Sequence, residues 1–217
     1  MNTHDILLTI QYITIVVLFI EIWIVFMKWS NPIHSYLFFA CISSFISNMG
    51  YLLEMKATTE EAYLSALKLS YVGRVFIVLA FFLFSAKMCR IKIPKWVIAA
   101  LLLVHIGIYV SILSLGSCNL YYTSYEFIPD PEFPRFTHED GPLHDLLMAM
   151  NGVLACTAFY WVFREYRKEK NRTARSRLLM LMLAFGVQIL SFFLEVTHVF
   201  PVSKYFDITM PDRKSVV

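Results

Sequence analysis

The run WVIAALLLVHIGIYVSILSL, residues 96–115, contains no Asp, Glu, Lys or Arg. A helix that crosses a bilayer needs about 20 consecutive, mostly apolar residues. Five more stretches meet the same requirement, three before this run and two after it. We therefore predict six membrane-spanning helices, at residues 6–27, 33–53, 63–89, 96–115, 146–163 and 178–199.

The composition supports this fold class. Of the 217 residues, 58% are hydrophobic and 16% are charged, whereas a soluble domain is about 45–50% apolar and about 25% charged. Each span must satisfy its own backbone hydrogen bonds in hydrocarbon, which favours helices. We predict an all-α integral membrane protein, a polytopic bundle in contact with the lipid bilayer. A nucleic-acid partner is not expected, because no soluble fold carries a basic stripe.

The first span is predicted to be a retained helix rather than a signal peptide. The residues before it are Asn2, Thr3, His4 and Asp5, which provide no basic segment. The apolar run is also too long for a signal peptide, and no small-residue cleavage site follows it.

Basic residues predict the orientation of the bundle. They are concentrated in the connections after the first, third and fifth spans, and residues 164–177 alone contain seven Lys and Arg. Because cytoplasmic loops are enriched in Lys and Arg, these connections should face the cytoplasm, and the N-terminus should lie outside. The 116–145 connection then becomes a sizeable extracellular loop. The basic segment 164–177 becomes a cytoplasmic loop that extends the helices beside it.

Polar residues inside the spans suggest a candidate site. Ionisable groups within a membrane are costly and usually face the bundle interior or a cavity. We expect most of them in the outer half of the membrane and only Glu21 in the inner half. One hypothesis is a ligand-binding cavity that opens outward, with Arg74 as its central cation. Its candidate residues are Asn48, Glu54, Arg74, Asn151, Gln188 and Glu195. The alternative is that these side chains only hold the helices together or reach the membrane interface. The sequence leaves both open.

No metal, cofactor or catalytic site is expected. His138, Glu139, Asp140 and His144 lie close together in the outer loop and could in principle bind a metal. Their spacing matches no standard metal site, so a solvated loop is the preferred interpretation. The four cysteines show no metal-ligand spacing and no readable disulfide framework. Phosphate-binding, dinucleotide-binding and nucleophile motifs are also absent from the sequence.

Several short motifs, in order, resemble a known family. They are Gly50-Tyr51-Leu52-Leu53-Glu54, Leu67-Lys68-Leu69-Ser70-Tyr71-Val72-Gly73-Arg74, Asn119-Leu120-Tyr121-Tyr122-Thr123, Gly141-Pro142-Leu143 and Phe206-Asp207-Ile208-Thr209. Together they resemble the seven-transmembrane N-terminal input region of bacterial sensor histidine kinases and diguanylate cyclases.

The resemblance implies one sensor-type transmembrane domain, residues 1–217, in the bacterial cytoplasmic membrane. It would detect an extracellular or membrane signal, and would itself not be an enzyme. The signal would pass to a cytoplasmic output domain, in cis or on a partner protein, and a homodimer is possible. The similarity stops where a seventh helix is expected, because Asp212-Arg213-Lys214-Ser215 cannot begin an apolar span. We therefore expect a truncated chain. The alternatives are a small membrane transporter or an inactive fragment, although the uninterrupted spans and the lack of an internal repeat argue against a transporter.

Overall fold

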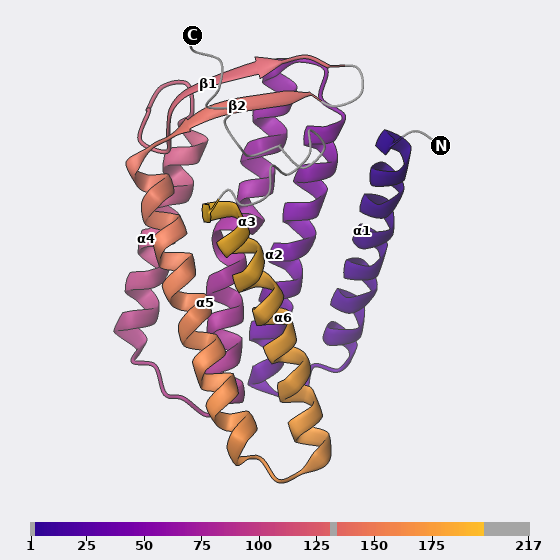
Figure 1. The fold of residues 1–217 in the computed structure, drawn as a ribbon, viewed down its shortest axis with the longest axis vertical. Helices are drawn as coiled ribbons and strands as arrows, with labels where there is room; N and C mark the ends of the chain where they lie inside the picture. Colours follow the sequence, from indigo (N-terminus) through magenta and orange to yellow (C-terminus); the bar gives the residue numbers. More distant parts are fainter. Residues whose placement is uncertain (1–2, 131–133, 198–217) are drawn as a thin grey trace.

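A computed structural model of the chain describes residues 3–130 and 134–197. Figure 1 shows a bundle of long helices with a small β-hairpin at one end. The helices are α1 (Thr3–Met27), α2 (Pro32–Met55), α3 (Glu60–Met88), α4 (Lys95–Leu113), α5 (Pro142–Lys168) and α6 (Arg172–Thr197). Among the described residues, the five helices α1 to α5 are long and apolar enough to cross a membrane. The predicted helical membrane bundle is confirmed.

Capping residues place several helix starts outside the apolar runs. Asn31 caps α2 by accepting a hydrogen bond from the Ile33 backbone N at 3.1 Å, and Thr59 caps α3 from Ala62 N at 3.3 Å. Pro142 opens α5, where a missing N–H costs nothing. α5 therefore begins before the expected span at 146–163, and it also ends after it, at Lys168. The last two residues of the expected span at 178–199 lie outside the described residues.

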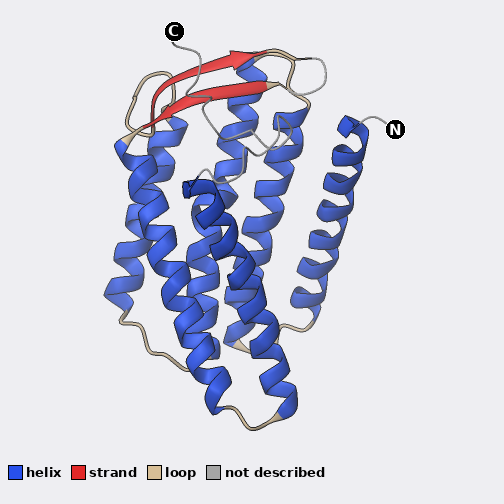
Figure 2. Cartoon of the chain, in the orientation of Figure 1, coloured by secondary structure: helices blue, strands red, loops and turns tan. Residues whose placement is uncertain are grey.

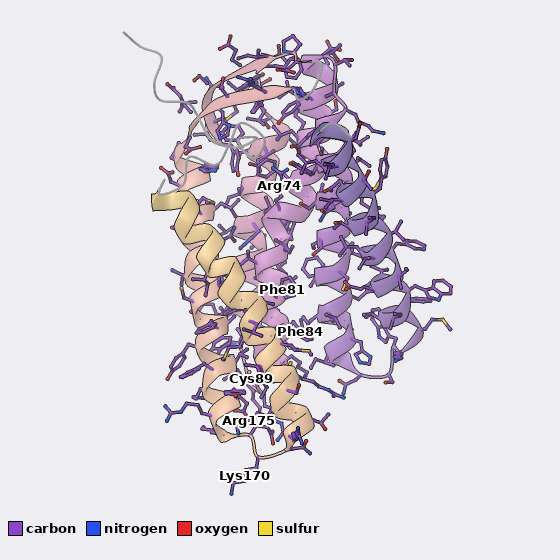
Figure 3. All side chains as sticks on the ribbon, turned by 45° about the vertical axis from the view of Figure 1, so that its right-hand side comes forward. Arg74, Phe81, Phe84, Cys89, Lys170 and Arg175 are labelled. Carbon is purple, nitrogen blue, oxygen red and sulfur yellow. The ribbon has the colours of Figure 1, made fainter. Side chains whose placement is uncertain are left out.

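The two ends of the bundle differ in charge. The α1–α2, α3–α4 and α5–α6 connections lie at the end opposite the hairpin, and the first turn of α1 lies at the hairpin end (Figure 1). Figure 3 shows Lys170 and Arg175 at the end opposite the hairpin, beyond Cys89, which directly follows α3. The three basic connections therefore share one end, which is the arrangement on which the predicted orientation rests.

α2 and α3 cross with their backbones in contact. A Cβ added to Gly73 of α3 would overlap the Ser43 carbonyl oxygen of α2, and one added to Gly50 would overlap the Ser70 backbone. Both glycines belong to the motifs that carry the family resemblance. The side chains on this crossing must therefore meet at short range, and the candidate site lies beside it.

α1 is attached to the bundle through α2, and most of its large apolar side chains are exposed (Figure 1). Lipid is the natural environment for such a surface. Its polar attachment is Gln11, whose Nε2 donates to Asn48 O at 2.8 Å and to Asn48 Oδ1 at 3.0 Å. Lys56 Nζ at the end of α2 also donates to the Tyr12 hydroxyl.

The connection at 116–145, expected to be a loop, contains two strands. It contains β1 (Tyr122–Ile128) and β2 (Arg135–Asp140), paired antiparallel from Tyr122↔Asp140 to Ile128↔Arg135 with a bulge near Ser124. Figure 2 shows these two strands together at one end of the helices. Burial alternates along β2, where Phe136 and His138 face the core. Aromatic residues on one face make this short hairpin stable because the bundle buries them.

Candidate outer polar site

The central feature of the site is an ion pair between α2 and α3. Arg74 Nη2 donates to both carboxylate oxygens of Glu54, at 3.2 Å each. The Ser70 hydroxyl also donates to Glu54 Oε1. Glu54 is 1% exposed, and a buried carboxylate is very costly unless it is paired and hydrogen-bonded. These contacts supply both requirements.

The Arg74 backbone lies deeper in the bundle than the guanidinium at the end of its side chain. Arg74 is the middle residue of the 29-residue α3, whereas Glu54 is next to the last residue of α2. Helical side chains lean toward the helix N-terminus, so the Arg74 side chain reaches toward the hairpin end, where Glu54 lies. Figure 3 shows Arg74 between the hairpin and Phe81 of the same helix. The sequence predicted that these two charges lie in the same half of the membrane, and the structure brings them into contact.

The cation of the pair is more accessible than the carboxylate. The Arg74 side chain is 24% exposed, against 1% for that of Glu54. Its guanidinium carbon lies 5.3 Å from the ring centre of Tyr71 and 5.9 Å from that of Tyr51, within reach of a cation–π interaction. In the described part of the chain, the hydrogen bonds of Arg74 all leave Nη2, so Nε and Nη1 have no partner there.

Tyrosines connect this pair to the hairpin. The Tyr71 and Tyr122 hydroxyls lie 2.5 Å apart, and Tyr121 packs edge-on against Tyr71 with ring centres 5.3 Å apart. Burial raises the pKa of Tyr121 and of Tyr122 well above the usual value for a phenol, so both keep their protons. Phe136 of β2 stacks on Tyr63 of α3 at 4.9 Å. The hairpin is therefore packed onto α3 through aromatic side chains.

The other four candidate residues do not all meet at this pair. Asn48 bonds to Gln11 of α1 and donates from Nδ2 to Ser44 O at 2.8 Å. Asn151 on α5 has a buried Oδ1 with no hydrogen-bond partner among the described residues. The side chains of Gln188 and Glu195 lie outside the part of the chain that the structure describes. The structure therefore joins two of the six candidates and shows Asn48 in a different contact.

Three residues of the site were missed among the sequence candidates: Ser70, Tyr71 and Tyr122. Ser70 had a detectable signal, because it precedes Arg74 by four residues and shares its helix face. Tyr71 and Tyr122 lie in the motifs of the family resemblance, but their contact joins residues 51 positions apart. No local spacing predicts such a contact.

Within the histidine cluster of the hairpin, His138 departs from the solvated loop that we expected, whereas Glu139 and Asp140 are exposed. His138 is 5% exposed, and its ring centre lies 4.1 Å from that of Tyr122. Burial lowers the pKa of His138 to about 4, so its imidazole is neutral at neutral pH. The local sequence looked polar, but the hairpin turns this side chain inward.

The fold and the site together define a polytopic membrane protein with a buried polar pair beneath an aromatic hairpin. A family model described as the N-terminal 7TM region of histidine kinase matches residues 8–211. The chain belongs to this family, and the resemblance seen in the sequence is confirmed. The comparison with curated proteins gave no match, and neither did the comparison with solved structures. Since the family is an N-terminal sensory region, the chain is a multi-pass membrane input region of the histidine kinase type.

Proposed function

We propose that this chain detects an extracellular or membrane signal at the Glu54–Arg74 pair and passes it to a cytoplasmic output domain. The observation that carries the proposal is the unequal exposure of the two partners. The Glu54 side chain is 1% exposed, whereas the Arg74 side chain is 24% exposed, and two of its guanidinium nitrogens have no hydrogen-bond partner among the described residues. Ion pairs inside membranes commonly mark functional sites. The proposed location is the bacterial cytoplasmic membrane.

The chemistry of Arg74 suggests the kind of group that the signal offers. A planar guanidinium binds carboxylates and phosphates through paired N–H donors. An anionic or strongly accepting group could bind Nε and Nη1, and would then compete with Glu54 for the cation. Asn151, whose buried Oδ1 has no hydrogen-bond partner among the described residues, is a proposed further contact. Gln188 and Glu195 of α6 remain proposed contacts from the sequence.

A change at this pair has a direct route across the membrane. α3 runs from the hairpin end, past Arg74, to Met88 at the basic end. α3 crosses α2 so closely that there is no room for a Cβ at Gly50 or Gly73. Such close packing resists continuous deformation. A signal would shift α3 relative to α2 only if it bound two arrangements with different affinity. Breaking or keeping the Glu54–Arg74 pair would supply such a difference.

The output is proposed to be a histidine kinase, in cis or on a partner protein, with a diguanylate cyclase as the alternative and a homodimer as the working assembly. Reading the gene beyond the codon for Val217 in its native locus tests this. A further apolar span followed by a kinase domain would support the main proposal, and a cyclase domain would support the alternative. The sensory proposal would fail if the purified chain in liposomes carried out substrate-dependent flux and no signalling domain or partner were encoded nearby.

A further inference from the structure

Three ligand-type side chains converge where the hairpin joins α5. Asp140 is the last residue of β2, and His144 and Asp145 lie in the first turn of α5. One ligand atom from each of the three lies within 4.8 Å of the others. His144 Nδ1 is 3.3 Å from Asp140 Oδ1 and 3.9 Å from Asp145 Oδ1. These residues lie outside the Glu54–Arg74 pair.

The spacing fits a metal ion better than it fits hydrogen bonds. His144 Nδ1 is buried and has no hydrogen-bond partner in the described part of the chain, although two carboxylates are near it. In a tetrahedral zinc site the bonds to N and O are about 2.0–2.1 Å, which puts neighbouring ligand atoms about 3.4 Å apart. The His144–Asp140 distance already has this value. The Asp145 side chain is 78% exposed and can close its longer distance by a small rotation.

A fourth, independent side chain is directed at the same place. The His138 side chain is only 3% exposed, and its Nε2 lies 3.4 Å from Asp140 Oδ1. Its Nδ1 has no hydrogen-bond partner in the described chain. Packing against Tyr122 holds this buried imidazole in position. Metal-binding carboxylates are commonly oriented by a second group of this kind.

We propose that Asp140, His144 and Asp145 bind a divalent transition-metal ion of the Zn²⁺ class, with His138 orienting the Asp140 carboxylate and water completing the coordination. One imidazole and two carboxylates form a mixed N/O ligand set that suits Zn²⁺ better than Mg²⁺ or Ca²⁺, which prefer oxygen ligands alone. The α5 N-terminus carries a partial positive charge that disfavours a cation. Two carboxylates outweigh it.

A bound ion would be mechanically connected to the outer polar pair. Tyr122 lies against the rings of both His138 and His144, at 4.1 and 5.8 Å between ring centres, and its hydroxyl contacts that of Tyr71. Tyr71 in turn packs on Arg74. Occupancy of the metal site would therefore fix the end of β2 and the start of α5 above the Glu54–Arg74 pair. The ion would act as a second signal, or its binding would be required for detection of the signal proposed at the Glu54–Arg74 pair.

The test is a calorimetric titration of Zn²⁺ into the chelator-treated full chain in lipid nanodiscs, with Mg²⁺ and Ca²⁺ as comparison ions. We expect one Zn²⁺ per chain. His144→Gln, Asp140→Asn and Asp145→Asn should each weaken affinity by about 100-fold or more, because loss of an outer-shell partner such as His138 (His138→Gln) already costs about 10–100-fold. His34→Gln, at the opposite end of the bundle, is the matched control and should leave the affinity unchanged.

Three results would overturn the proposal. They are absence of saturable Zn²⁺ binding by the wild type, unchanged affinity in Asp145→Asn, and an equal loss in His34→Gln. Asp145 is exposed, so its variant has no structural reason to misfold. Thermal unfolding of each variant in chelator shows whether it still folds like the wild type. Added Zn²⁺ should then raise the unfolding temperature of the wild type and of His34→Gln, but not of the three ligand variants, since a ligand stabilises only a folded state that binds it.

Discussion

Arg74 and Glu54, twenty residues apart on the neighbouring helices α3 and α2, are joined by one guanidinium nitrogen that contacts both carboxylate oxygens at 3.2 Å. The same carboxylate receives the Ser70 hydroxyl. The pair holds together two helices whose backbones already touch. It also leaves the Arg74 side chain 24% exposed.

Removing the carboxylate charge should destabilise the bundle. Breaking a fully buried ion pair costs about 3–5 kcal/mol; because Arg74 keeps some exposure, we expect Glu54→Gln to lower the free energy of unfolding by about 2–3 kcal/mol. Denaturant-driven unfolding in mild detergent measures this. Glu61→Gln, an exposed carboxylate in the first turn of α3, is the control. An equal effect of both substitutions would show that the pair contributes nothing specific.

The α2–α3 crossing gives a second prediction. Gly73→Ala places a methyl group on the Ser43 carbonyl oxygen, so the helices must separate and the chain should lose stability. Gly107→Ala in α4 is the matched control, since nothing lies within 4 Å of the added Cβ. A helical Gly→Ala change at such an open position should stabilise by about 0.5–1 kcal/mol. Opposite signs in the two variants are expected, and the same sign in both would contradict the close crossing.

The hairpin contact gives a third prediction. Tyr122→Phe removes the hydroxyl that meets Tyr71, and a hydrogen bond of this kind contributes about 1 kcal/mol. Adding Tyr71→Phe should cost little more, because both substitutions remove the same bond. Unfolding free energies of the two single variants and the double variant measure this coupling, with exposed Tyr160→Phe as control. Fully additive losses would mean that the two hydroxyls do not interact.

The attachment of α1 gives a fourth prediction. Gln11→Leu removes the two bonds to Asn48, which should cost about 0.6–2 kcal/mol in a membrane bundle. Among the described elements, α1 packs closely against α2 alone. Amide hydrogen exchange should therefore rise along α1 in Gln11→Leu. Thr14→Val is the control, because the Thr14 hydroxyl donates to the Ile10 carbonyl within α1 itself. Exchange that stays at the wild-type level would show that apolar packing alone holds α1.

The helical bundle was predictable because length and hydropathy decide it locally. Residues 96–115 need no tertiary information to be assigned to a membrane span. The Glu54–Arg74 site was predictable in part, since few ionisable residues lie in the spans and the helix directions put these two on the same side. Asn48 shows the limit, because an amide that could line a cavity is used instead to hold Gln11.

The hairpin and the burial of His138 could not be read from the sequence. β1 and β2 are short, and they alternate only weakly within a stretch rich in turn residues. His138 is buried because Tyr122 and Phe136 cover it after the strands pair. Such burial depends on contacts between segments, and a polar local sequence then predicts solvent exposure incorrectly.

The central claim, that the Glu54–Arg74 pair sets the state passed to the output domain, is tested most directly by autophosphorylation of the full-length gene product in native membranes. Wild type, Arg74→Ala, Glu54→Gln and the control Glu61→Gln would be compared at equal membrane levels. We predict that Arg74→Ala and Glu54→Gln change the basal rate in the same direction, because both break one pair, while Glu61→Gln leaves it unchanged. Wild-type rates in all three variants would contradict the claim.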